Sequence, residues 1–202
     1  MRRVLTALVT AVLYFGSALG APAAPAPAAA RADPSAIRLI DQNDRPFTLR
    51  DLRGRPVLLT FVATRCTDAC PIANAVFAEL QNDLERRHVD ARLLTVTLDP
   101  GNDTPFVMAT AARRLGADPR RWRFASGSVP DVQRLLRAFD VVVEPDAQGI
   151  PDVHSTFVYL LDRDGHLSRS MLLSTTIRQE ALAALAAQPP SAARPFQAAS
   201  SK

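Results

Sequence analysis

The sequence has little of several features that would point directly to a function. Its 202 residues include two cysteines and a single lysine, Lys202, so the formal net charge of +4 comes almost entirely from arginine. No basic run is interleaved with aromatic residues, which leaves nucleic-acid binding without support. The three methionines are scattered along the chain, which excludes a methionine-rich copper tract.

The first apolar run is shorter than the roughly 20 residues that a membrane-spanning helix requires. It covers residues 4–19, follows Arg2 and Arg3, and ends in small residues at Ala18 and Gly20. This pattern is typical of a secretory signal peptide, which we place at residues 1–20. A retained N-terminal membrane anchor is the alternative. Both hypotheses put the folded domain in the periplasm or another extracytoplasmic compartment, exported through this signal and, in the second case, tethered to a membrane.

The rest of the chain divides into one domain and two flanking segments. Residues 21–36 are rich in Ala and Pro and have no hydrophobic periodicity, which is typical of an extended linker. Residues 189–202 carry no apolar pattern, so we expect a disordered tail. With 48% hydrophobic residues, the chain can bury one substantial core, which we place at residues 37–188.

Strand patterns alternate with helix patterns through this domain. Residues 57–62 form a short, apolar, β-branched run, which is typical of a central strand covered on both faces. Further strands are expected at 91–98, 122–125, 155–161 and 166–172, with an N-terminal hairpin within 37–49 and a polar loop at 144–152. Helices are expected at 71–86, 105–115, 129–138 and 176–187, with Pro105 in the first turn of the second and Ser128 as the cap of the third. This order predicts an α/β fold with a mixed, mostly parallel central sheet flanked by helices.

Both cysteines fall between the central strand and the helix pattern that follows it. Pro71 suits the first turn of a helix, so Cys66 and Cys70 are expected at or just before a helix N-terminus, as in a thioredoxin-like sheet. The unpaired backbone N–H groups and the helix dipole there favour the thiolate, which is the form that attacks disulfides and binds soft metals. The spacing of the two cysteines leaves three interpretations open: a structural disulfide, a redox couple or a metal-binding pair.

His154 favours the metal-binding interpretation. It follows the polar loop and precedes an apolar strand, at a sheet edge where functional side chains gather. Two thiolates and one imidazole suit copper, or zinc with an open position, and an extracytoplasmic site favours copper. We expect the other two histidines, His88 and His166, to be surface residues. The expected roles of the nearby carboxylates are structural: a solvated helix start for Asp68, a turn for Asp99, and a turn or a helix cap, shared with Thr104, for Asp103.

Three segments together resemble the Sco (SenC/PrrC) family: residues 64–71 (TRCTDACP), 98–105 (LDPGNDTP) and 152–165 (DVHSTFVYLLDRDG). Members of that family are thioredoxin-fold proteins that help to deliver copper to the dinuclear copper centre of cytochrome c oxidase. The resemblance implies that Cys66, Cys70 and His154 bind Cu(I) or Cu(II), and that the cysteines also cycle between dithiol and disulfide. It further implies a copper-accepting partner, subunit II of the oxidase, and other periplasmic copper chaperones as further candidates.

The chain departs from the family pattern at two places beside the cysteines. The family often has a Gly-Tyr pair where this chain has Val62-Ala63, and a proline after the first cysteine where it has Thr67. The ligand-type residues are all kept. We therefore expect a copper metallochaperone, with a thiol–disulfide oxidoreductase that attacks through Cys66 as the alternative.

Two other functions are disfavoured. A peroxide reductase would need a Pro-x-x-x-Thr/Ser-x-x-Cys segment, which this sequence lacks. An inert structural disulfide is ranked last, because closing a loop of three intervening residues gives little chain-entropy stabilisation.

Overall fold

The structure, a computed structural model, describes residues 33–147, 149–152 and 156–189. The predicted signal peptide or anchor at 1–20, most of the predicted linker, residues 190–202 of the predicted tail, and His154 all lie outside this part. Among the described residues, no helix is both long enough and apolar enough to cross a membrane.

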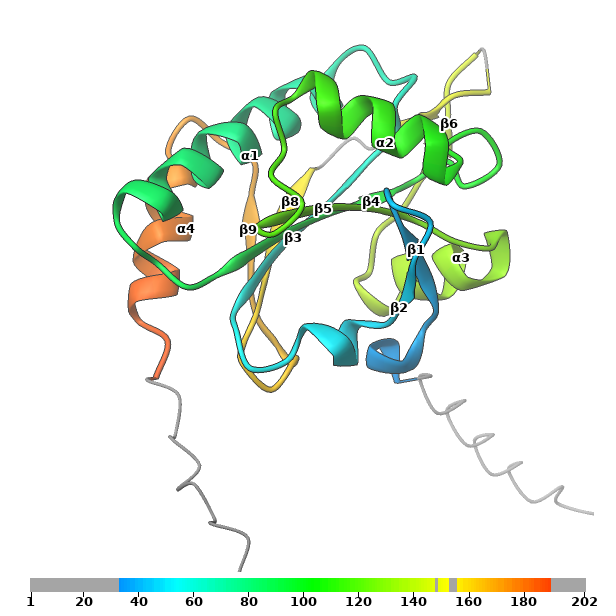
Figure 1. Ribbon diagram of the computed structural model, residues 1–202. Coiled ribbons are helices and arrows are strands. Elements are labelled where there is room, and N and C mark those ends of the chain that lie inside the picture. The colour runs from blue at the N-terminus through cyan, green and yellow to red at the C-terminus, as the bar shows by residue number, and fades with distance from the viewer. Residues whose placement is uncertain (1–32, 148, 153–155, 190–202) are drawn as a thin grey trace, which may run out of the picture. The chain divides into compact units, whose positions relative to one another are not determined.

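A seven-stranded sheet forms the centre of the described chain, in the order β2-β1-β5-β4-β3-β8-β9 (Figure 1). The strands are β1 (Leu39–Asp41), β2 (Pro46–Phe47), β3 (Val57–Val62), β4 (Arg92–Thr97), β5 (Trp122–Ser126), β8 (Phe157–Leu161) and β9 (Leu167–Leu172). All six residues of β3 are buried, as expected for a central strand whose two faces are both covered.

The sheet is mixed, as predicted, but the prediction that it is mostly parallel is wrong. Only β3–β4 and β4–β5 are parallel; the pairs β1–β2, β1–β5, β3–β8 and β8–β9 of the described chain are antiparallel. The predicted N-terminal hairpin is confirmed, and its β1 adds to the sheet against β5. Because β8 runs antiparallel to β3, with Leu59 opposite Tyr159, its first residues lie beside the last residues of β3.

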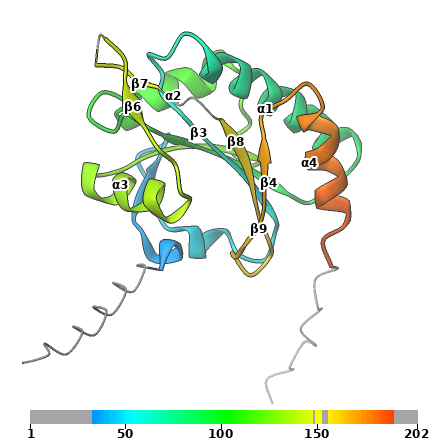
Figure 2. The same ribbon diagram turned by 180° about the vertical axis from the view of Figure 1, so that it is seen from behind.

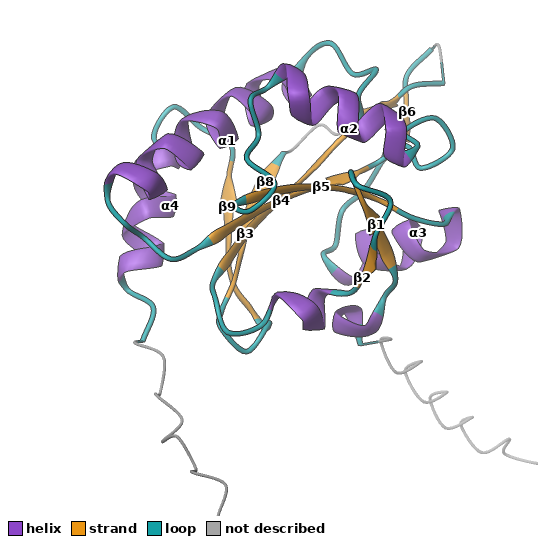
Figure 3. Ribbon diagram, viewed as in Figure 1, coloured by secondary structure: helices purple, strands orange, loops and turns teal. Residues whose placement is uncertain are grey.

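Helices cover both faces of the sheet (Figures 1 and 3). They are α1 (Ala69–Arg86), α2 (Pro105–Arg114), α3 (Val129–Ala138) and α4 (Ile177–Ala186), with short 3₁₀ turns at Pro34–Ala36 and Leu49–Leu52. The side chains of β3 alternate between two core clusters: Leu58 packs with residues of α1, α2 and α4, whereas Leu59 and Phe61 pack with residues of α3.

The helix starts follow the expected capping chemistry. Thr104, rather than Asp103, caps α2, accepting a hydrogen bond from the backbone N–H of Val107, and Pro105 follows at the first helical position. Ser128 caps α3 as predicted. The segment 144–152, which was predicted as a polar loop, contains two short strands. β6 (Glu144–Pro145) and β7 (Pro151–Asp152) pair as a small antiparallel ribbon, seen from behind in Figure 2.

Three aromatic rings pack edge to face on the α3 side of the sheet. The ring centroids of Phe61, Phe139 and Tyr159 lie 5.0 to 5.8 Å apart, and Cys66 packs against the same core cluster. Such pairs add about 0.5–1.5 kcal/mol beyond the area that they bury. Tyr159 is only 5% exposed, and burial, with a smaller contribution from Asp140, raises its pKa to about 12.

The raised pKa of Tyr159 predicts a loss of stability in alkali. The folded state favours the neutral phenol, so this stabilisation is complete below about pH 10 and is lost as the pH rises from about 10 to about 12. At 1.36 kcal/mol per pKa unit, we expect a loss of about 2 to 3 kcal/mol. Urea unfolding from pH 9 to 12 should show this loss in the wild type but not in Tyr159→Phe. An equal loss in both proteins would contradict the assignment to this side chain.

Candidate functional site

The two cysteines lie where β3 leads into α1, at the carboxyl ends of the parallel strands. Cys66 is in the turn between Val62 and Ala69, and Cys70 is in the first turn of α1. The sequence predicted both at a helix N-terminus, and the structure confirms that position. The carboxyl ends of parallel strands are where α/β sheets bind ligands.

The two thiols differ in access. Cys70 is 1% exposed, and the backbone N–H of Ala63 donates a hydrogen bond to its Sγ over 3.4 Å. Cys66 is half-buried, and the two cysteines are not joined by a disulfide in this structure. A partner molecule therefore reaches Cys66 more readily, while Cys70 is held by the fold.

Both cysteines line one cleft of about 480 Å³ between α1 and α2. Asn74 also lines it, and its buried Oδ1 has no hydrogen-bond partner among the described residues. Phe106, which is 76% exposed, forms part of its outer wall. The cleft gives an incoming group access to a region that both thiols share.

A buried carboxylate fixes the turn that carries Cys66. Asp103 is fully buried in the loop before α2, and its Oδ2 accepts hydrogen bonds from the backbone N–H of Thr64 over 3.1 Å and from the hydroxyl of Thr97 over 2.7 Å. The Thr64 hydroxyl donates to the other oxygen of the same carboxylate. Asp103 thereby joins the end of β4 to the residues just before Cys66.

A second carboxylate holds the neighbouring arginine. Oδ2 of Asp99 accepts hydrogen bonds from both Nε and Nη2 of Arg65, over 3.2 and 2.7 Å, and Asn102 donates to the same carboxylate. Asp99 is 8% exposed, so this ion pair is partly shielded from solvent. Both residues preceding Cys66 are therefore tied to the loop between β4 and α2.

The β6–β7 ribbon lies against the other side of the cysteine turn. Asp146, Ile150 and Pro151 line a small cavity of about 60 Å³ together with Cys66 and its neighbours Arg65, Thr67 and Asp68. His154 follows β7 by two residues in the sequence and lies outside the described residues. Its predicted role as a ligand therefore stays a prediction.

The remaining predicted residues of the described chain form no metal-binding group with the two thiols. Asp68 is exposed at the start of α1, where its side chain caps none of the helix N–H groups, and His88 is exposed just after that helix. Within the described chain, neither Asp68, Asp99 nor Asp103 forms a group of three potential metal ligands with the cysteines. These carboxylates thus have structural or solvated positions, as expected.

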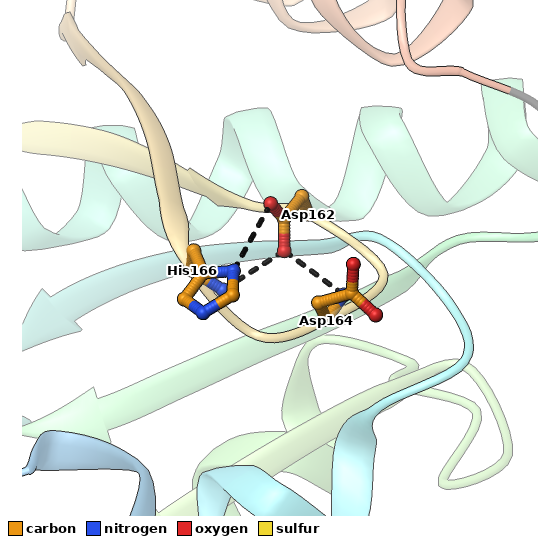
Figure 4. A group of neighbouring side chains, drawn as sticks. All are labelled: Asp162, Asp164 and His166. Carbon is orange, nitrogen blue, oxygen red and sulfur yellow. Dashed lines mark hydrogen bonds and ion pairs between the residues drawn. The ribbon is translucent and has the colours of Figure 1, made fainter.

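His166 belongs to a different edge of the sheet. Its Nδ1 lies 3.6 Å from Oδ2 of Asp162, and Asp164 completes a group of three potential ligands in the β8–β9 turn (Figure 4). Oδ1 of Asp162 already accepts hydrogen bonds from the backbone N–H groups of Asp164 and His166, so the group closes its own turn. β8 ends there beside Val57, the first residue of β3, whereas Cys66 follows the last.

Sequence reasoning assigned Asp99 and Asp103 to a turn and a cap and missed their bonds to the cysteine turn. Thr64 and Asp103 are 39 positions apart, so no local pattern links them. One signal was available: both carboxylates follow β4, and the carboxyl end of β4 adjoins that of β3, where Thr64 and Arg65 were expected.

A mixed sheet with two thiols at its first parallel β–α turn defines a thioredoxin-like dithiol protein, and comparison with known proteins assigns the family. The family model for SCO1/SenC matches residues 28–188, so this chain belongs to the SCO1/SenC family. The SCO1 protein homolog of Bacillus subtilis (strain 168) is 27% identical over 127 residues, a match that covers 62% of this chain and 66% of that relative.

Solved structures confirm the thioredoxin-like fold. A SCO1/SenC family lipoprotein from Bacillus anthracis matches with a TM-score of 0.68 and 22% identity, over 74% of this chain and 90% of the other. ScoI of Bradyrhizobium japonicum, solved with copper bound, matches with a TM-score of 0.63 and 27% identity, over 74% and 95%. BsSco, described as a member of the Sco family of cytochrome c oxidase assembly proteins with a disulfide switch, matches with a TM-score of 0.65 and 24% identity, over 74% and 88%.

Removing the Asp103 carboxylate should loosen the cysteine turn. Asp103→Ala leaves the Thr64 N–H and two hydroxyls without their acceptor, which we expect to lower the free energy of unfolding by about 3 kcal/mol. The rate of Cys66 alkylation in the folded protein should rise. Asp164→Ala, which removes an exposed carboxylate, is the control and should change stability by less than about 0.5 kcal/mol. Equal effects of the two substitutions would show that Asp103 does not anchor the turn.

Proposed function

We propose that this protein binds one copper ion through Cys66, Cys70 and His154 and passes it to an acceptor protein during assembly of the copper centre of cytochrome c oxidase. The observation that carries this proposal is the pair of cysteines, one accessible and one buried, that line a single cleft. Two thiolates suit Cu(I), and an added imidazole gives a site that tolerates both oxidation states.

The described residues around position 154 support its inclusion in the site. On one side, Pro151 of β7 shares a small cavity with Cys66. On the other, the hydroxyl of Thr60, near the end of β3, donates a hydrogen bond over 3.1 Å to the carbonyl of Phe157, the first residue of β8. The described residues on either side of position 154 therefore lie near Cys66 and near the end of β3, which supports an imidazole ligand from this part of the sequence.

The relatives support copper as the cargo and the oxidase as the destination. Copper is bound in the structure of Bradyrhizobium japonicum ScoI, and BsSco is described as belonging to a family of cytochrome c oxidase assembly proteins. We infer that the acceptor is subunit II of the oxidase, with other periplasmic copper chaperones as further candidate partners. A lipoprotein among the structural relatives supports an extracytoplasmic location near a membrane, reached through the N-terminal signal.

A thiol–disulfide oxidoreductase is the second candidate. It is favoured by the unequal exposure of the two cysteines, since the accessible Cys66 can attack a partner disulfide and the buried Cys70 can then resolve the mixed disulfide. The disulfide switch described for BsSco supports the same chemistry. This function needs both cysteines but not His154.

Copper titration of variants tests the three-ligand site. We expect the reduced protein to bind one copper ion, with thiolate-to-Cu(II) charge-transfer bands, and Cys66→Ser, Cys70→Ser and His154→Ala each to weaken binding at least tenfold. His88→Ala, at an exposed histidine, is the matched control and should bind as the wild type does. Unchanged copper affinity in His154→Ala would reject the imidazole as a ligand.

Disulfide exchange separates the two candidate functions. If the protein is an oxidoreductase, the wild type and His154→Ala should oxidise or reduce a cysteine-containing partner at equal rates, and Cys66→Ser should be inactive. If it is a copper carrier, mixing it with a soluble domain of oxidase subunit II should remove the charge-transfer bands of this protein and transfer the copper to that domain. A Cys66–Cys70 reduction potential below about −300 mV, typical of structural disulfides, would argue against catalytic redox turnover.

A further inference from the structure

Five arginines surround a cavity at the edge of the sheet opposite the cysteines. The cavity has a volume of about 300 Å³ and is lined by Arg55, Arg92, Arg120, Arg121 and Arg123, together with Leu52, Leu93 and Pro119. Arg55 lies just before β3, Arg92 is the first residue of β4, and the other three arginines lie at the start of β5. Because these three strands are parallel, their amino ends bring the arginines together at one edge.

Carboxylates neutralise only the outer part of this arginine cluster. Nε of Arg55 lies 3.1 Å from Oδ1 of Asp90, and Nη2 of Arg120 lies 2.9 Å from Oδ2 of Asp118. Asp51 and Glu85 act on the cluster only through longer-range attraction. Among the described residues, no carboxylate lines the cavity itself. The cavity is therefore positively charged, and the carboxylates that pair with its arginines lie outside its lining.

Arg92 is the member of the cluster that has an unsatisfied buried nitrogen. Its Nε is buried and has no hydrogen-bond partner among the described residues. Burial lowers the pKa of its guanidinium, the neighbouring Arg55 and Arg123 lower it further, and Asp90 only partly opposes them. A buried donor without a partner costs about 1–3 kcal/mol, more when it is charged, and the charge of a nearby anion would offset part of that cost.

Neighbouring contacts hold two other guanidinium groups in place. The guanidinium carbon of Arg123 lies 4.9 Å from the centre of the Phe47 ring, a cation–π contact. Nη1 of Arg121 donates to the backbone carbonyl of Val89 over 3.4 Å. The cluster is thus oriented by the fold before any ligand arrives, which lowers the entropic cost of binding.

We propose that the cavity formed by Arg55, Arg92, Arg120, Arg121 and Arg123 is a binding site for a phosphate group. Planar guanidinium groups match the geometry of phosphate oxygens and bind them in pairs of hydrogen bonds. The volume lies at the lower end of the range for small-molecule sites, which fits a phosphate or a small phosphomonoester. The phosphate could belong to a free metabolite or to the headgroup of an anionic lipid, and the site is independent of the proposed copper function.

Thermal unfolding of the full chain, with inorganic phosphate replacing chloride at constant ionic strength, tests the site. We expect phosphate to raise the melting temperature of the wild type, since a ligand that binds the folded state stabilises it. Arg92→Gln and Arg121→Gln should each bind phosphate at least tenfold more weakly. Arg134→Gln, at a half-exposed arginine of α3 that does not line the cavity, is the control and should respond like the wild type.

Cosedimentation with vesicles identifies the source of the phosphate. Binding to phosphatidic acid vesicles but not to phosphatidylcholine vesicles, lost in Arg92→Gln and Arg121→Gln, would assign a lipid headgroup; a response to inorganic phosphate alone would assign a soluble ligand. Stabilisation no greater than that of chloride, or equal in wild type and both variants, would overturn the site. Copper binding should be unchanged in these variants, so the phosphate site and the copper site can be rejected independently of each other.

Discussion

The buried carboxylate of Asp103 is the constraint on which the cysteine turn depends. It accepts hydrogen bonds from Thr97 at the end of β4 and from Thr64 just before Cys66, so one side chain joins the carboxyl ends of the two central parallel strands. A buried carboxylate is stable only when hydrogen-bond donors satisfy it. The positions of Thr64 and Thr97 are therefore constrained together with that of Asp103. The loop that leads into α2 therefore holds the β3–α1 connection, and with it Cys66, in position.

The parallel order of β3, β4 and β5 also separates the cysteines from the arginine cluster. The carboxyl ends of β3 and β4 carry the thiols and their anchoring carboxylates, whereas the amino ends of β3, β4 and β5 carry the arginines. The loops that precede parallel strands lie at one edge of the sheet, and the loops that follow them lie at the other. Side chains that are far apart in the sequence therefore come together at each edge without a local motif. Charge at the arginine edge lies several strand residues from the two cysteines, beyond most of its influence in salt.

The sequence predicts the features of this structure that depend on residues close together in the chain, and it misses those that depend on residues far apart. The strand at 57–62 and the helix starts at Pro105 and Ser128 were predictable, because β-branched runs and capping residues act within a few positions. The direction of β8 was not, since antiparallel pairing with β3 is decided by tertiary packing. The same distinction holds at the site: the cysteines were found from their place after a strand, whereas the Thr64–Asp103 bond joins residues 39 positions apart. The ribbon at 144–152 was missed because its two-residue strands leave no periodic pattern.

Under the proposed function, the unequal exposure of the two thiols gives copper transfer an order. An acceptor thiolate can approach copper only from the side of Cys66, since Cys70 is 1% exposed and its sulfur accepts a hydrogen bond from the Ala63 N–H. Cys66 would then be displaced first, while Cys70 retains the ion until a second acceptor ligand arrives. The same asymmetry suits a redox couple, in which the exposed sulfur attacks and the buried one resolves. Because one geometry serves both reactions, only a residue needed by one of them distinguishes the two functions, and His154 is that residue.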